Sequence, residues 1–216
     1  MQRISNLFNR QLAAATAAVI MMTLTAIGCG KPPVTLNRYL LEYPSPVSGS
    51  RPTLPDSIRV ELFAAVQSLT TTAMIYRPKP YEASSYAYNR WQVSPSHLVT
   101  DYLLRDLRNS GLFQGVFGYQ QSGGVSRFKL EGAVQEFAEV DAPDGWKAVL
   151  AISINLLDTN QEEITRRVIM QQNYCSEESM PDQTPLGLAG GMSRAMERIS
   201  AQVIADVYQA ASRAGR

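Results

Sequence analysis

The sequence predicts a mixed α/β fold of the α+β kind, in which an antiparallel-rich sheet is covered by two main helices. Three strand-like segments follow one another in the second half of the chain, at residues 127–140, 146–157 and 164–174. The short polar turns between them begin at Asp141 and Asp158. Because connections this short join neighbouring antiparallel strands, the three segments are expected to form a meander.

The middle strand indicates that one face of this sheet is buried. Between residues 147 and 157, apolar side chains alternate with polar ones such as Lys147 and Ser153, which is the period of a half-buried strand. A helix at residues 188–212 supplies part of the cover, because its apolar residues recur three or four positions apart. This apolar stripe comprises Leu188, Met192, Met196, Ile199, Val203 and Val207.

The preceding part of the domain is expected to contain the other main helix. Ser94 and Pro95 form a typical helix start, and Gly111 is a typical helix end. Asp101 and Arg105 are spaced to pair on the solvent side of this helix. Further strands are predicted at residues 57–62, 73–77, 85–91 and 112–119.

The N-terminal 28 residues have the layout of a secretory signal peptide. Arg3 and Arg10 precede an apolar run at residues 12–24, and small residues then lead to Cys29. The apolar run is shorter than the roughly 20 residues that a membrane-spanning helix needs. We therefore expect residues 1–28 to be removed.

The cysteine at the cleavage point indicates a lipoprotein. Residues 26–29 resemble the bacterial lipobox, with Ala26 in place of the usual leucine, and a lipid on Cys29 would anchor the mature chain. The alternative is a secreted protein with a chance cysteine. In lipoproteins of this type an aspartate after the cysteine resembles an inner-membrane retention mark, so Gly30 favours the outer membrane, facing the periplasm.

The mature chain divides into a tether and one domain. Half of the twelve prolines fall between residues 32 and 55, so residues 29–56 are expected to form a lipid-anchored, proline-rich tether with one early strand. Residues 57–216 then form a single α/β domain, because 188 mature residues suffice for one well-buried core.

Composition and motifs argue against several classes of function. Without Arg3 and Arg10, 18 basic residues face 19 acidic ones, and this balance does not favour nucleic-acid binding. With Cys29 acylated, Cys175 is the remaining thiol and His97 the one histidine, too few for a zinc site or a catalytic triad. The glycines at 187–191 are interpreted as a flexible helix entry. We expect no catalytic residue, metal or cofactor.

One segment combines aromatic and basic residues at unusual density. Tyr76, Arg77, Arg90 and Trp91 are predicted to lie on two strands, and these residue types are enriched in interaction hot spots. Neighbouring residues on a strand point to opposite faces, so the arginines are expected to be exposed and the rings to pack inward. The alternative is a strand pair whose rings simply pack on the helix.

Several short segments follow one another in a characteristic order. They are Cys29, residues 39–41, 58–62, 75–77 and 88–91, the helix start at 94–95, and residues 110–113. This order resembles that of the PqiC-like family of ABC-type transport auxiliary lipoproteins of Gram-negative bacteria. Residues 66–72 depart from the family pattern, because they lack the proline-rich stretch that usually precedes the tyrosine–arginine pair.

This resemblance implies a fold similar to the N-terminal domain of TolB and a non-enzymatic role beside an ABC transporter. The expected partner is an MCE-domain periplasmic subunit of a system that moves lipids between the two membranes, and a ring-like homo-oligomer is also implied. An outer-membrane assembly lipoprotein that binds a client polypeptide or lipopolysaccharide is the alternative, and a lipoprotein enzyme is a third class. A lipid-sized apolar pocket would favour the assembly lipoprotein. A pocket that contains an acid or base with a shifted pKa would favour the enzyme.

Overall fold

A computed structural model describes residues 35–47, 49–121 and 124–215. Residues from Leu36 onward form one compact unit. The predicted signal peptide and Cys29 lie outside the described residues. In the part that is described, no helix has the length and apolar character needed to cross a membrane.

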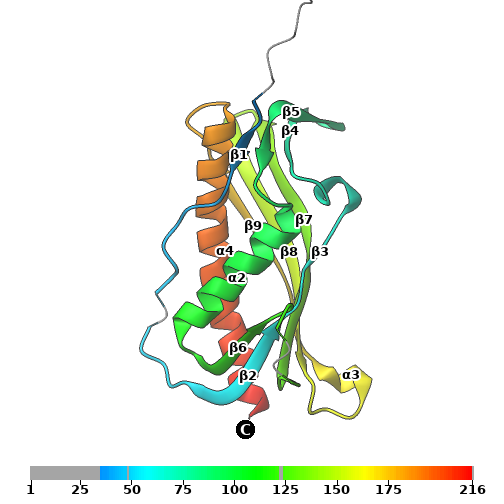
Figure 1. The fold of residues 1–216 in the computed structure, drawn as a ribbon, viewed down its shortest axis with the longest axis vertical. Helices are drawn as coiled ribbons and strands as arrows, with labels where there is room; N and C mark the ends of the chain where they lie inside the picture. Colours follow the sequence, from blue (N-terminus) through cyan, green and yellow to red (C-terminus); the bar gives the residue numbers. More distant parts are fainter. Residues whose placement is uncertain (1–34, 48, 122–123, 216) are drawn as a thin grey trace, which may run out of the picture. The chain divides into compact units, whose positions relative to one another are not determined.

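The chain forms a sheet with its two long helices on one face (Figure 1). In chain order the elements are β1 (Asn37–Tyr39), β2 (Leu54–Val60), β3 (Ala64–Ala65), the 3-10 helix η1 (Gln67–Leu69), β4 (Ala73–Lys79), β5 (Glu82–Trp91), α2 (Pro95–Ser110), β6 (Phe113–Gly118), β7 (Phe128–Ala142), β8 (Gly145–Asp158), α3 (Ile164–Arg167), β9 (Val168–Ser179) and α4 (Pro185–Ala214).

Strand β7 organises the sheet, because it pairs along both of its edges. Its partner on one side is β8, which is antiparallel over its whole length and pairs in turn with antiparallel β9. This confirms the predicted meander. On the other side, β2, β3 and β4 follow one another along β7, and all three are parallel to it. Beyond them lie β6, beside β2, and β5 and β1, beside β4.

The prediction of an antiparallel-rich sheet is wrong. Among the described residues, five of the eight strand pairings are parallel. The physical reason is that β2, β3 and β4 continue in one direction along the same neighbour, so each repeats the orientation of the one before. Short turn signals reveal hairpins only, whereas parallel pairing joins segments distant in sequence.

Helix α4 buries the apolar face of the meander, as the sequence predicts. All six residues of its apolar stripe are fully buried, as is the inward row of β8 from Ala148 to Leu156. The glycine run does not form a flexible entry, because it lies inside α4. A Cβ at Gly191 would lie 2.6 Å from the Cβ of Ala148, so this glycine lets the helix approach the sheet closely.

The chain between β1 and β2 packs on the helices, although the sequence assigns it to a tether. Leu41 and Tyr43 are buried in the core, and the hydroxyl of Tyr208 on α4 donates to the carbonyl oxygen of Pro52 at 2.9 Å. The compact unit therefore starts about twenty residues before the predicted boundary at residue 57. We call residues 40–53 the strap.

The last strand of the meander also differs from its predicted range. Residues 164–167 form the short helix α3, and β9 continues to Ser179. Its buried residues Tyr174, Ser176 and Glu178 alternate with exposed ones.

Candidate interaction surfaces

The four residues proposed as a partner interface lie on β4 and β5. Trp91 is fully buried, and its ring meets Phe137 edge to face with centroids 5.0 Å apart. The ring of Tyr76 lies 5.1 Å from that of Tyr86. The Trp91 ring thus packs inward as predicted, whereas Tyr76, Arg77 and Arg90 are each half-buried.

The two arginines hold different positions. Arg77 forms an ion pair with Glu136 of β7 and keeps 42% of its side chain exposed. Arg90 donates to the carbonyl oxygens of Asn89 and Tyr86, where the register of β5 shifts against β4. Arg90 is opposite Ala73, so four residues of β4, about 13 Å, separate it from Arg77 along the strand. The structure therefore gives Arg90 a role within β5 and leaves Arg77 more available to a partner.

A buried carboxylate lies behind this region. Glu139 is fully buried, and its Oε2 accepts a hydrogen bond of 2.7 Å from the hydroxyl of Tyr86. Its other oxygen has no hydrogen-bond partner among the described residues. Burial raises the pKa of Glu139, and hydrogen bonding from Tyr86 partly offsets that rise.

Asp106 joins the strap to both long helices. This α2 residue is fully buried and accepts from the hydroxyls of Tyr43 at 2.7 Å, Ser45 at 2.8 Å and Ser200 at 2.6 Å. Arg105 Nε donates to the same carboxylate at 2.8 Å, and its guanidinium lies 4.4 Å from the Tyr43 ring centroid. The expected pair of Arg105 with Asp101 is replaced by this contact. The strap is thus held by a charged, hydrogen-bonded cluster.

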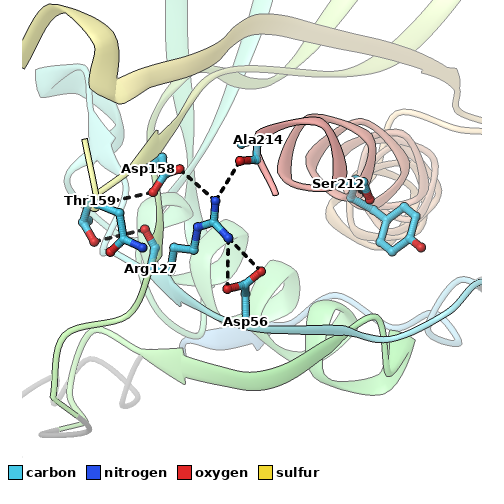
Figure 2. Close-up of polar contacts among 8 residues, drawn as sticks. Asp56, Arg127, Asp158, Thr159, Ser212 and Ala214 are labelled. Atoms are coloured by element: carbon cyan, nitrogen blue, oxygen red, sulfur yellow. Dashed lines mark hydrogen bonds and ion pairs between the residues drawn. The ribbon is translucent and has the colours of Figure 1, made fainter. Parts of the chain in front are cut away.

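Arg127 forms a second polar cluster at the opposite end of the sheet (Figure 2). Its guanidinium donates to both oxygens of Asp56 at 3.2 Å, to Asp158 at 3.2 Å and to the carbonyl oxygen of Ala214 at 2.8 Å. These partners belong to β2, β8 and the last turn of α4. A cation at a helix C-terminus also complements the helix dipole. The cluster ties three elements together, and Nε of Arg127 is buried without a hydrogen-bond partner among the described residues.

A surface groove lies between β9 and the C-terminal half of α4. Its volume is about 620 Å³, and it is open to solvent with a mixed polar and apolar lining. Such a groove does not match the enclosed apolar pocket expected of a lipid-binding protein. Its lining comprises Ile169, Met170, Gln172, Asp206, Gln209, Ala210, Arg213 and Ala214.

The residues considered for chemistry, His97 and Cys175, lie on different elements of the fold. His97 Nδ1 is 2.9 Å from Ser94 Oγ at the start of α2, and Cys175 is an exposed free thiol on β9. Burial and neighbouring carboxylates raise the pKa of Cys175, which disfavours the thiolate. No cluster of three or more potential metal ligands occurs in the described residues.

Comparison with known proteins identifies the family. The ABC-type transport auxiliary lipoprotein component family matches residues 39–204. The chain belongs to this family. It is therefore an auxiliary lipoprotein component of an ABC-type transport system, and as a lipoprotein it is anchored to a membrane. The family resemblance predicted from the sequence is confirmed.

Solved structures of similar fold include XCC0632 of Xanthomonas campestris, of the DUF330 family. It is 16% identical, with a TM-score of 0.74 over 83% of this chain and 98% of that one. An uncharacterized protein, also 16% identical, has a TM-score of 0.58 over 81% and 97%. The PelC dodecamer of Paraburkholderia phytofirmans is 18% identical over 74% and 91%, with a TM-score of 0.40. No curated protein matches the sequence.

The structures with TM-scores of 0.74 and 0.58 share the fold of this chain, and the expected resemblance to TolB is not supported. Sequence reasoning also missed Asp106, Arg127 and Glu139. Asp106 had a detectable signal, because it lies three residues after Leu103 on the apolar face of α2, where a charge needs partners. Arg127 and Glu139 depend on long-range neighbours and carry no comparable local signal.

Proposed function

We propose that this auxiliary lipoprotein is a non-enzymatic docking component, held at the outer membrane by a lipid on Cys29. In this proposal it faces the periplasm and serves an MCE-type system that moves lipids between the membranes. The family match carries the proposal. The signal-like segment before Cys29 and Gly30 after it support the anchor and the outer membrane.

The packed strap limits how far the domain can stand from its anchor. The compact unit starts at Leu36, which is seven positions after Cys29 in the chain. Even fully extended, they span at most about 25 Å. A lipid on Cys29 would therefore keep the domain close to the membrane surface, where it could receive the end of a transporter that reaches across the periplasm.

Arg77 is the residue that we propose to contact the MCE-domain subunit. Its side chain is 42% exposed and pairs with Glu136, which points to the opposite face of β7 from the buried Phe137. Arginine at such a site offers directional hydrogen bonds to carboxylates or carbonyls. Trp91 and Tyr76 support this surface from the inner side, and Arg90 fixes the local course of β5.

Metabolic labelling and membrane fractionation test the proposed anchor. Metabolic labelling with a radioactive fatty acid should label the wild-type protein and leave Cys29→Ser unlabelled. Retained label in that variant would refute the anchor. Membrane fractionation of the labelled protein then reports whether it lies in the outer membrane.

A pull-down against an MCE-domain periplasmic subunit from the same organism tests the docking surface. Arg77→Ala should weaken capture, whereas Arg166→Ala should not, because Arg166 is an exposed arginine of α3 that pairs with Glu163. Equal capture by both variants would remove Arg77 from the interface. Absence of any such subunit, together with binding of an outer-membrane client, would favour the assembly-lipoprotein alternative.

A further inference from the structure

Three turns of the compact unit lie side by side at one end of the sheet. The β4–β5 turn lies beside the end of β7, because β4 runs parallel to β7 up to the pair of Arg77 and Val140. The β7–β8 turn follows that end directly, and the β9–α4 loop contacts it through Gln183, whose Nε2 donates to Asp141 Oδ1 at 3.2 Å. Strand β1 also begins here (Figure 1). This proximal end comprises Leu36, Tyr88 and residues 79–82, 141–147 and 180–186.

The exposed aromatic side chains gather at the proximal end. Among the described residues, the aromatic side chains that are exposed are those of Tyr81, Tyr88 and Trp146. Tyr81 and Trp146 lie at two of the turns, and Tyr88 lies on β5 next to its contact with β1. Leu36 and Leu186, at the starts of the compact unit and of α4, are exposed as well. Tyrosine and tryptophan concentrate where a membrane meets water, because their rings are apolar and their tips are polar.

Tyr81 has a conformation that contacts within the domain do not explain. Its φ is 67°, in the left-handed region that favours glycine. Its side chain is fully exposed, so no packing against the domain offsets the unfavourable backbone. Such an outlier is typical of a residue that acts on something outside its own fold.

The length of the preceding chain favours a membrane as that contact. Leu36 is seven positions after Cys29, and this stretch spans at most about 25 Å. The lipid that we propose on Cys29 would therefore hold the proximal end near the bilayer. The inference rests on this proposed anchor and goes beyond it, because an anchor alone leaves the domain free to turn.

The charges of the proximal end indicate which lipids suit it. Its three turns carry two lysines and four carboxylates. Lys79 pairs with Glu82 at 2.9 Å, and Lys147 pairs with Asp144 at 3.0 Å. Binding to anionic lipids depends on an excess of basic side chains, which these turns lack. Zwitterionic headgroups are therefore the better match.

We propose that the proximal end rests on the membrane surface, with the rings of Tyr81, Tyr88 and Trp146 among zwitterionic headgroups such as those of phosphatidylethanolamine. The domain then has one orientation on the membrane. Helix α4 begins at the lipid surface, and the opposite end of the sheet, which carries α3, points away from it.

Quenching of tryptophan emission tests this orientation. The full-length acylated protein is reconstituted into vesicles of phosphatidylcholine with brominated acyl chains, which quench tryptophans close to the bilayer. Trp146 should be quenched relative to vesicles without bromine. The Trp146→Phe variant should lose this quenching, because the remaining tryptophan of the described residues, Trp91, is fully buried in the core.

A variant of Tyr81 tests the contact without harming the fold. Tyr81→Gly suits the left-handed backbone, so its melting temperature should equal or exceed that of wild type. Time-resolved emission of Trp146 gives the ratio of docked to undocked protein. This ratio should fall about tenfold in Tyr81→Gly, because one large ring no longer leaves water. The control is Ile164→Ala, which removes an exposed apolar side chain at the opposite end and should leave the ratio unchanged.

Flotation of the same vesicles checks the anchor separately. Protein that fails to float with them contradicts the lipid anchor, and this orientation with it. Protein that floats with Trp146 unquenched contradicts the orientation alone. Equal ratios in Tyr81→Gly and Ile164→Ala would remove the Tyr81 ring from the contact. Stronger docking when phosphatidylglycerol replaces part of the phosphatidylcholine would overturn the assignment to zwitterionic headgroups.

Discussion

Replacing Asp106 with alanine should destabilise the protein strongly, because this carboxylate holds the strap on the two long helices. Three hydroxyl groups donate to it, from Tyr43, Ser45 and Ser200, at distances of 2.6 to 2.8 Å. Arg105 contributes a charged partner. In the variant the buried hydroxyls of Tyr43 and Ser200 lose their acceptor and the guanidinium loses its counter-ion.

The magnitude follows from the number of groups left without partners. A buried polar group without a partner costs about 1–3 kcal/mol, and breaking a buried charged pair costs about 3–5 kcal/mol. These contributions overlap at one carboxylate, so we expect the free energy of unfolding to fall by about 3–5 kcal/mol. For a domain of this size that lowers the melting temperature by about 6–20 °C.

Thermal and urea unfolding followed by circular dichroism measure this loss. Asp101→Ala is the matched control, because Asp101 is an exposed carboxylate on the same helix, and its replacement should change stability by about 0.5 kcal/mol or less. Limited proteolysis should also cut Asp106→Ala within the strap before the sheet. A melting temperature equal to that of Asp101→Ala would refute the structural role given to Asp106.

Four further substitutions test the core and its electrostatics. Trp91→Ala should lower the free energy of unfolding by about 3–5 kcal/mol, because the ring is fully buried. Gly191→Ala should lower the free energy of unfolding, because the new Cβ would lie 2.6 Å from the Cβ of Ala148. Gly190→Ala is the control, because its Cβ would have no neighbour closer than 3.7 Å. This control should raise the free energy of unfolding by about 0.5–1 kcal/mol, since alanine favours the helix more than glycine does. Glu139→Gln should be more stable than wild type at pH 7 and lose that advantage as the pH falls towards 4.5, the ordinary pKa of glutamate.

The sign of the Glu139 effect comes from proton linkage. Burial raises the pKa of Glu139 in the folded protein, so the folded state holds this proton more tightly than the unfolded chain. The stabilisation of the folded wild-type protein by this proton is complete at pH values below the pKa of Glu139 in the unfolded chain. It is lost as the pH rises through the pKa of Glu139 in the folded protein. A stability difference between Glu139→Gln and wild type that does not change with pH would contradict this reasoning. Equal melting temperatures of the Gly190→Ala and Gly191→Ala variants would contradict the close contact between α4 and β8, because they would show that the helix can shift away from the strand.

Part of the candidate interface was predictable from residue alternation. Because adjacent residues of a strand face opposite ways, the sequence predicts that the rings of Tyr76 and Trp91 pack inward and that the arginines beside them are exposed. In the structure Trp91 is buried, Arg77 keeps 42% of its side chain exposed, and Arg90 is half-buried. The separation of Arg77 from Arg90 was not predictable. It follows from the shifted register between β4 and β5, which no local pattern records.

The sequence by itself determined the elements whose burial follows a local period. Alternation across residues 147–157 and the helical stripe of α4 indicate which faces are apolar, and short polar turns predict the antiparallel meander of β7, β8 and β9. The order of short segments along the chain also sufficed to predict the family.

Only the tertiary structure decided how distant segments meet. The parallel pairings of β2, β3 and β4 with β7 and the packing of the strap through Asp106 involve partners far apart in sequence. A periodic pattern reports that a face must be buried, but it does not specify what buries it. That choice depends on which long loops close with the best packing and fully paired polar groups, which is a property of the whole chain.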